Sequence, residues 1–169
     1  MKTIKKLAVC LVMFTFSAAM FAQVSATSTA SATIVTPIAI SNTAALNFGN
    51  VAVNSSAGTV VMTAAGVRSV TGGCTLPAVA GSPAAASFNV TGTANYTYAI
   101  TLPAVATTIS SGANSMTVDT WTSTPTSTGT LNGSGTQTLT VGGTLHVGAG
   151  QASGTYTSAT PFTVTVNYN

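Results

Sequence analysis

TYTSATPFTVTVNYN, residues 155–169, is the stretch that decides the fold of this chain. From Phe162 onward, bulky apolar residues stand at every second position, namely Phe162, Val164, Val166 and Tyr168, and smaller polar residues fill the gaps. This alternation predicts a β-strand with one apolar and one polar face. Such a strand needs hydrogen-bond partners, which come either from earlier strands of the same chain or from another molecule.

The beginning of the chain has the layout of a secretory signal peptide. Three lysines precede an apolar run at 7–16, and small residues follow it. We expect cleavage after Ala22, with cleavage after Ala19 as the alternative. The apolar run is too short to span a membrane. The predicted organisation is a signal peptide at 1–22, an extended N-terminal arm at 23–32 and one β-sandwich domain at 33–169.

Removal of the signal peptide leaves a chain with almost no charge. The sequence has four basic residues, and three of them are the lysines of the signal. Arg68 and Asp119 remain, together with His146. Nucleic-acid binding needs clustered Lys and Arg, so the composition argues against it. A surface without net charge also lacks the repulsion that keeps proteins apart in solution, which favours association.

Period-two patterns and turn signals recur along the remaining residues. We expect strands at 34–40, 45–53, 58–64, 67–76, 86–91, 96–102, 115–121, 138–147 and 162–168, with an exposed loop at 123–135. Residues 86–91 and 96–102 are expected to pair as a hairpin. Gly142 and Gly143 are expected to form a two-residue turn within 138–147. Nine or ten strands without a helix of three turns predict an all-β sandwich.

Three segments of the chain resemble a known family. ATIVTPIAISNTAALNFGNV, TQTLTVGGTLHV and SGTYTSATPFTVTVNY are similar to the secreted bacterial proteins grouped as domain of unknown function 4402, over about Ala32 to Asn169. More distantly, the LNFG turn at 46–49 and the GTY…V.V.Y ending resemble spore coat U-like and chaperone–usher pilin domains. Many pilin domains carry a cysteine pair, whereas Cys74 is the single cysteine after residue 22.

The pilin likeness implies an immunoglobulin-like antiparallel β-sandwich that lacks one strand. In pilins a periplasmic chaperone lends that strand first, and the N-terminal arm of the next subunit then replaces it. By this analogy the strand-donor candidates are Val24, Ala26, Ser28, Ala30 and Ala32. The acceptor-edge candidates are Phe162, Val164, Val166 and Tyr168. The donor positions are smaller than the anchors usual in pilin arms.

The residue types that carry catalysis are nearly absent after residue 22. There is no Glu or Lys, and Cys74, Asp119 and His146 are single representatives of their types from separate segments. We therefore expect no enzyme, and no catalytic, cofactor or metal site. Cys74 is expected to be a small buried hydrophobe and His146 to point to solvent. Asp119 is expected to cap a turn or to pair with a polar group, for which Arg68 is one candidate.

The sequence predicts a secreted, non-catalytic structural or adhesive protein of the cell surface, reached through the periplasm. As a fimbrial or coat subunit it would assemble by β-strand addition with copies of itself or related subunits, helped by a periplasmic chaperone and an outer-membrane usher. The mature chain is expected to hold no transmembrane segment. The alternative is a self-complete monomeric domain that binds a surface glycan through Trp121, Tyr96 and Tyr98. A flat threonine face for ice binding is a weaker alternative.

Overall fold

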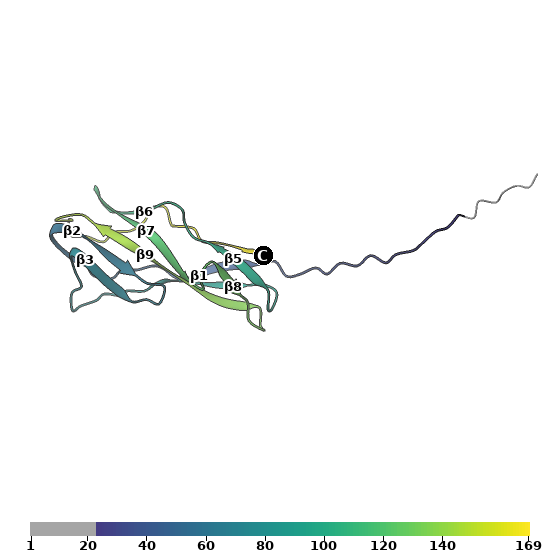
Figure 1. The fold of residues 1–169 in the computed structure, drawn as a ribbon. Helices are drawn as coiled ribbons and strands as arrows, with labels where there is room; N and C mark the ends of the chain where they lie inside the picture. The colour runs from purple at the N-terminus through teal and green to yellow at the C-terminus, as the bar shows by residue number, and fades with distance from the viewer. Residues whose placement is uncertain (1–22) are drawn as a thin grey trace, which may run out of the picture. The chain divides into compact units, whose positions relative to one another are not determined.

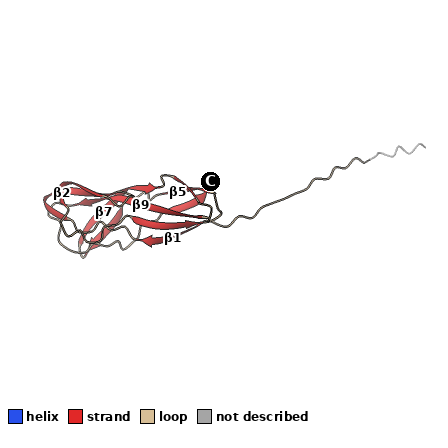
Figure 2. Cartoon of the chain, turned by 90° about the horizontal axis from the view of Figure 1, so that it is seen from below, coloured by secondary structure: helices blue, strands red, loops and turns tan. Residues whose placement is uncertain are grey.

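The computed structural model describes residues 23–169 (Figure 1), so the signal peptide predicted at 1–22 lies outside the described residues. The chain divides into two units, Met1–Thr33 and Ile34–Asn169. In the first unit, residues 23–33 are exposed and have no regular secondary structure. The second unit holds ten β-strands, and the described part of the chain contains no helix (Figure 2). Residues 23–169 therefore contain no helix that is long and apolar enough to cross a membrane.

Seven strands form a large antiparallel sheet around β9. They are β1 (Ala39–Ala44), β2 (Ala52–Met62), β3 (Arg68–Thr75), β4 (Ala86–Thr91), β6 (Thr107–Ser111), β7 (Asn114–Thr124) and β9 (Thr136–Val147). One edge of β9 pairs with β4 and then with β2, and its other edge pairs with β7. Strands β1 and β3 continue the first side, and β6 continues the second.

Three short strands form a second antiparallel sheet, in which β5 (Thr97–Thr101) lies between β8 (Thr128–Thr130) and β10 (Thr165–Tyr168). In the stretch that leads into β10, Val164 and Val166 are buried while Thr163 and Thr165 are exposed. The alternation predicted for the end of the chain is thus confirmed. The prediction of an all-β antiparallel sandwich is also confirmed.

The core consists of two clusters. The first lies between the small sheet and the β4 half of the large sheet, and it consists of Ala86, Val90, Tyr98, Ile100, Leu131, Leu139, Val141, Val164 and Val166. The second lies on the β2 half of the large sheet, and it consists of Phe48, Val60, Met62, Cys74, Val118, Leu145 and Val147. In Figure 1, β5 and β8 lie near the C-terminus and β2 and β3 lie at the other end of this unit. The small sheet therefore covers only the first cluster.

The hairpin predicted for 86–91 and 96–102 is wrong. Both strands exist, but β4 belongs to the large sheet and β5 to the small one. Val90 and Tyr98 enter the first cluster from its two opposing layers. The connection at 92–96 is a crossover between sheets, which local turn signals do not distinguish from a hairpin.

The two-residue turn predicted at Gly142 and Gly143 is also wrong, because β9 runs through both residues without a break. Gly142 lies where the pairing with β4 ends and the pairing with β2 begins. A Cβ atom there would collide with the backbone of Met62 and its two successors, where the chain leaves β2. Gly142 therefore permits a close approach of two backbones rather than a reversal of the chain.

The boundaries of several strands differ from expectation. Strand β1 begins at Ala39 rather than at residue 34, since Pro37 has no N–H to donate. In the expected strand at 45–53, Asn47 forms an isolated bridge to Ala84, and regular pairing starts only at Ala52. Two short strands, β6 and β8, were not predicted. β8 lies within the stretch expected to be a loop.

Replacement of Gly142 with Ala tests the close-approach explanation. The added Cβ collides with main-chain atoms, so we expect a loss of about 1–3 kcal/mol in the free energy of unfolding, measured by urea titration. Gly133→Ala is the control, because a Cβ at Gly133 meets nothing within 4 Å. Equal stabilities of the two variants would contradict the explanation.

Candidate functional site

An open groove of about 960 Å³ lies over the second core cluster, where the small sheet does not extend. Its floor is the inner face of the large sheet, formed by Ile109, Met116, Val118, Leu145 and Val147 from β6, β7 and β9. Ile109 and Met116 are only partly buried. Val118, Leu145 and Val147 are buried, so Ile109 and Met116 are the floor side chains that remain partly accessible from outside.

One wall of the groove is the segment 45–53, which presents Leu46 and Phe48. Asn47 and Ala84 exchange two backbone hydrogen bonds of 2.8 Å. Arg68 Nη1 donates to the carbonyl of Phe48 at 2.6 Å and to that of Asn50 at 3.1 Å. The single cation among residues 23–169 therefore fixes the backbone of this wall.

The other wall is formed by residues 151–158 and Phe162. Thr157 bridges to Ser110 of β6 with backbone hydrogen bonds of 2.9 and 3.1 Å. Tyr156 donates its hydroxyl to the carbonyl of Ala152 at 2.7 Å and accepts from Gln151 Nε2 at 2.9 Å. These contacts hold an irregular segment against the edge of the large sheet.

Trp121 and Phe162 line the groove where it meets the first cluster. Their ring centroids are 4.4 Å apart, and Phe162 also makes an edge contact with Phe88 at 6.5 Å. Trp121 Nε1 is buried and has no hydrogen-bond partner among residues 23–169. A buried donor without a partner costs about 1–3 kcal/mol, so an acceptor brought to this nitrogen would be favourable.

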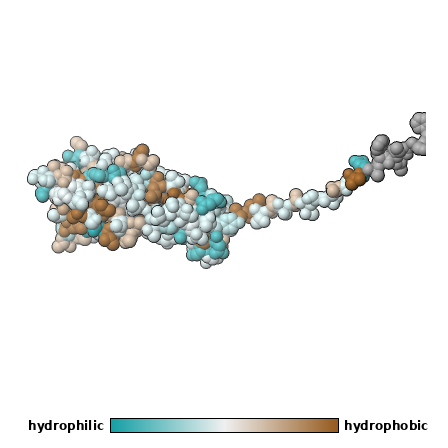
Figure 3. Space-filling model, viewed as in Figure 1, coloured by the Kyte–Doolittle hydropathy of each residue, from teal (hydrophilic) through white to brown (hydrophobic). Residues whose placement is uncertain are grey.

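Among residues 23–169, none of those that line the groove is charged. Figure 3 shows the wider surface of this domain as mostly pale, with separate brown apolar patches and few strongly hydrophilic residues. The walls add hydroxyl, amide and backbone groups to an apolar floor. Such a site suits an uncharged ligand with its own backbone or hydroxyl groups rather than an ion.

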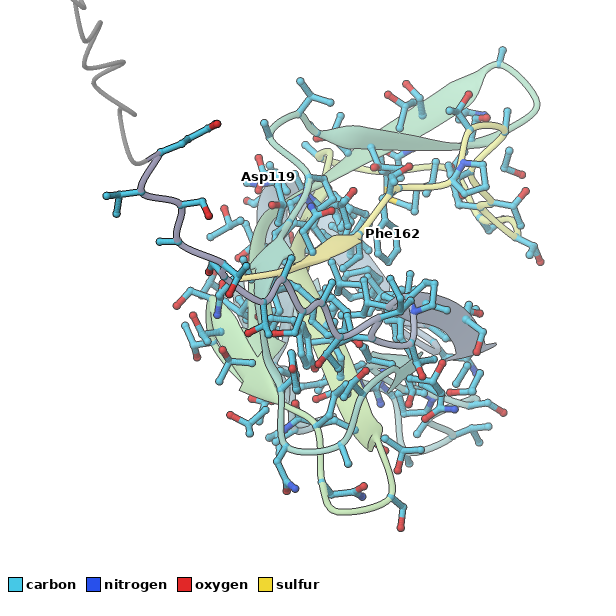
Figure 4. The ribbon with its side chains drawn as sticks, turned by 90° about the vertical axis from the view of Figure 1, so that its right-hand side faces the viewer. Asp119 and Phe162 are labelled. Atoms are coloured by element: carbon cyan, nitrogen blue, oxygen red, sulfur yellow. The ribbon has the colours of Figure 1, made fainter. Side chains whose placement is uncertain are left out.

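Three of the four predicted acceptor-edge residues lie outside the groove. Val164 and Val166 are buried in the first cluster, and β10 pairs with β5. The hydroxyl of Tyr168 accepts from the N–H of Thr93 at 2.6 Å and donates to the carbonyl of Thr36 at 2.8 Å. Of the four candidates, only Phe162 lines the groove (Figure 4).

The predicted donor positions all lie in the exposed arm. Every residue from 23 to 33 is exposed, and these include Val24, Ala26, Ser28, Ala30 and Ala32. The donor and acceptor assignments stay predictions. Sequence reasoning missed the floor of the groove, although Met116 and Val118 alternate with polar neighbours in a stretch that was expected to be a strand.

Cys74, Asp119 and His146 do not form a catalytic group. Cys74 is buried in the second cluster, and this burial raises the pKa of its thiol. Asp119, labelled in Figure 4, lies on β7 with a partly exposed side chain, and its Oδ1 is 2.8 Å from His146 Nε2. His146 is exposed, as expected, and Asp119 pairs with it rather than with Arg68. Within the described range no three His, Cys, Asp or Glu residues are close enough to hold a metal ion.

Hydroxyl groups cover much of the outer face of the large sheet. The pairing registers align one row across five strands, consisting of Thr108, Thr117, His146, Thr59 and Thr71. The hydroxyls of Thr59 and Thr71 are 2.7 Å apart. His146 and its partner Asp119 interrupt the threonines, so the face is not the regular ladder that the ice-binding alternative requires.

The three aromatic residues of the glycan-binding alternative do not form one platform. Tyr98 is fully buried, and its hydroxyl donates to Gln137 Oε1 at 2.8 Å. Tyr96 is 44% exposed and packs against Tyr168 with centroids 5.6 Å apart. Trp121 belongs to the groove.

The sequence pattern of one protein family, described as a domain of unknown function (DUF4402), matches residues 38–168. The chain belongs to this family. The match runs from just before β1 to the last residue of β10, so the DUF4402 domain includes both sheets and the whole groove. Comparisons with curated proteins and with solved structures found no match.

The Asp119–His146 pair predicts a small acid-dependent contribution to stability. Hydrogen bonds from His146 and Thr120 lower the pKa of Asp119 below its ordinary value of 3.8. A lowered pKa means that the contribution is present above about pH 3.8 and is lost as the pH falls through the folded-state value. Because both side chains are partly exposed, Asp119→Asn should cost less than about 1 kcal/mol at neutral pH. Urea unfolding of both proteins at pH 7 and pH 2.5 tests this, and a difference that does not become smaller in acid would contradict it.

Arg68→Met is expected to loosen the wall at 45–53. Two carbonyls lose a charged donor, so the free energy of unfolding should fall by about 2 kcal/mol. Arg68→Lys keeps a cation with fewer directed donors, so its free energy of unfolding should fall by less than that of Arg68→Met. Chemical denaturation measures both losses. A Met variant as stable as the wild type would show that Arg68 does not support the wall.

Proposed function

We propose that this protein is a secreted, non-catalytic structural subunit of the cell surface that associates by β-strand addition. A strand from another molecule enters the groove, lies on its apolar floor and completes the second layer of the sandwich. The observation that carries this proposal is the open groove above the second core cluster. Ile109 and Met116 on its floor are only partly buried, so an added strand would bury further apolar surface there.

The walls support a strand as the ligand. Alternate residues of an extended segment direct their N–H and carbonyl groups to opposite edges. The bridge from Asn47 to Ala84 uses one edge of the first wall, which leaves the backbone groups of Leu46 directed to the other. In the second wall, the bridge from Thr157 to Ser110 has the same effect for Tyr156. An added strand would find backbone partners along the groove as well as an apolar floor.

Other features agree with a structural role. The potential catalytic groups are separated, since Cys74 is buried and the Asp119–His146 pair lies among polar side chains on the outer face. The charges of Arg68 and Asp119 cancel at neutral pH, so little repulsion opposes association. Secretion through the periplasm rests on the signal-peptide pattern at 1–22, and a chaperone and usher are the partners that the pilin likeness suggests.

Blocking the groove tests the proposal. In purified protein comprising residues 23–169, Met116→Glu places a charge on the groove floor and should abolish assembly because the inserted strand would bury that charge. Thr117→Glu is the matched control. Thr117 is next to Met116 in the sequence, but its side chain is exposed on the outer face of the large sheet. Analytical ultracentrifugation and electron microscopy measure the assemblies.

We expect the wild type and Thr117→Glu to form oligomers or filaments and Met116→Glu to remain monomeric. Circular dichroism of each variant confirms that it is folded. A folded Met116→Glu variant that assembles like the wild type would overturn the proposal. A strictly monomeric wild type would also overturn it and favour the self-complete surface-binding domain.

A further inference from the structure

We infer that Trp121 caps the strand that enters the groove, because its indole N–H donates a hydrogen bond to the backbone carbonyl at the leading end of that strand. This inference rests on the proposed function and adds the residue that fixes how far the strand enters. It follows from the way β7 places the indole, from the unpaired indole nitrogen and from the position of Trp121 at the end of the groove.

A β-bulge turns Trp121 into the sandwich. The pairing of β7 with β9 shifts after Asp119, so that Thr120 and Trp121 together face the single residue Gly143. In a regular strand residue 121 would lie on the same outer face as Asp119. The extra residue of the bulge reverses this direction, and Trp121 packs against both core clusters instead.

Two features of this bulge are unfavourable for a strand. Thr120 has a φ of 50°, in the left-handed region that a β-branched residue rarely adopts. Gly143 weakens the interior of β9, but a Cβ atom there would lie only 3.1 Å from Cε3 of the indole. The ring therefore lies directly over the backbone of β9. Strained backbone of this kind occurs mostly at functional sites, and here it serves the placement of one side chain.

Apolar packing alone does not account for a tryptophan at this position. Nε1 of Trp121 is buried and has no hydrogen-bond partner within residues 23–169. A phenylalanine would also contact Phe162, whose ring centroid is 4.4 Å from that of Trp121, and it would bury no unpaired donor. Buried donors in folded proteins nearly always have a partner. The unpaired N–H therefore indicates an acceptor that arrives with another molecule.

An inserted strand carries such an acceptor at its end. Along the groove its backbone groups face the two walls, and its side chains alternate between the floor and the opposite side. Trp121 and Phe162 lie where the groove meets the first cluster, so the strand ends against them. A carbonyl at the end of a strand has no further residue of the ladder to pair with and needs another donor. Every strand has this group, so the cap selects a position rather than a sequence.

The surroundings of the indole fit a neutral acceptor and leave room to reach it. Trp121 also lines a second cavity of about 390 Å³, together with Ile100 and Leu102. The indole thus borders two open spaces, and a small rotation of the ring can direct its N–H toward the groove. No charged residue within 23–169 lines either space. A buried carboxylate would have no counter-charge there, whereas a carbonyl needs none.

Trp121 is the only tryptophan of the chain, so its donor can be removed selectively. In purified protein comprising residues 23–169, replacement of Trp121 with 3-benzothienylalanine puts a sulfur atom in place of the N–H and keeps the shape of the ring. Assembly should weaken about tenfold, the effect of one lost hydrogen bond, measured by sedimentation as the concentration of half-assembly. In the monomeric Met116→Glu background the unfolding midpoint should not fall, because the donor removed has no partner in the monomer.

Ultraviolet resonance Raman spectroscopy observes the same N–H directly, because one indole band changes frequency when the N–H is hydrogen-bonded. The assembled wild type should show the bonded band and the Met116→Glu monomer the unbonded band. Unchanged assembly of the benzothienyl protein, or a bonded band in the monomer as a bound water would cause, overturns this inference. The proposed function still stands in that case if Met116→Glu alone is monomeric. A wild type that does not assemble, or a Met116→Glu variant that assembles like it, overturns both.

Discussion

Strand β9 makes backbone hydrogen bonds along both of its edges, and the rest of the domain depends on this pairing. One edge binds β4 and then β2, and the other binds β7. The strand thereby passes under both core clusters, to which it contributes Leu139 and Leu145. The second layer is shorter, because β5, β8 and β10 cover only the first cluster. The open groove is a consequence of this unequal length of the two layers.

The local strand pattern was predictable and the assignment of strands to layers was not. Alternation identified the stretch around Val164 and Val166, because one buried face leaves a direct period-two signal. The glycines of β9 and the turn residues after β4 both indicated hairpins, and the structure has neither. Glycine permits a tight turn as well as the close approach of two backbones seen at Gly142, and the same turn residues occur in a crossover between sheets, so only tertiary structure decides between them. The lone cysteine was correctly expected in the core because it has no partner for a disulfide after residue 22.

The candidate site was less predictable than the fold. The alternating arm and the lack of charge are visible in the sequence, and they led to the hypothesis of strand addition. The floor of the groove combines residues from β6, β7 and β9 that lie far apart in sequence, and β6 was not expected at all. Phe162 and Trp121 were the groove residues named in advance, the second as part of the glycan-binding alternative, whereas Val164 and Val166 are buried in the first cluster. A gap in a layer is a property of the assembled sheets, so no single segment carries a signal for it.

The Tyr168 hydroxyl accepts one hydrogen bond and donates another, and the two bonds join separate segments of the chain. It joins Thr36, at the base of the arm, to Thr93, at the turn that leaves β4. Ala39 and Thr91 are the first paired residues of the β1–β4 ladder beside this junction. A single hydroxyl thereby closes the end of the ladder, where opening of the two strands would otherwise begin.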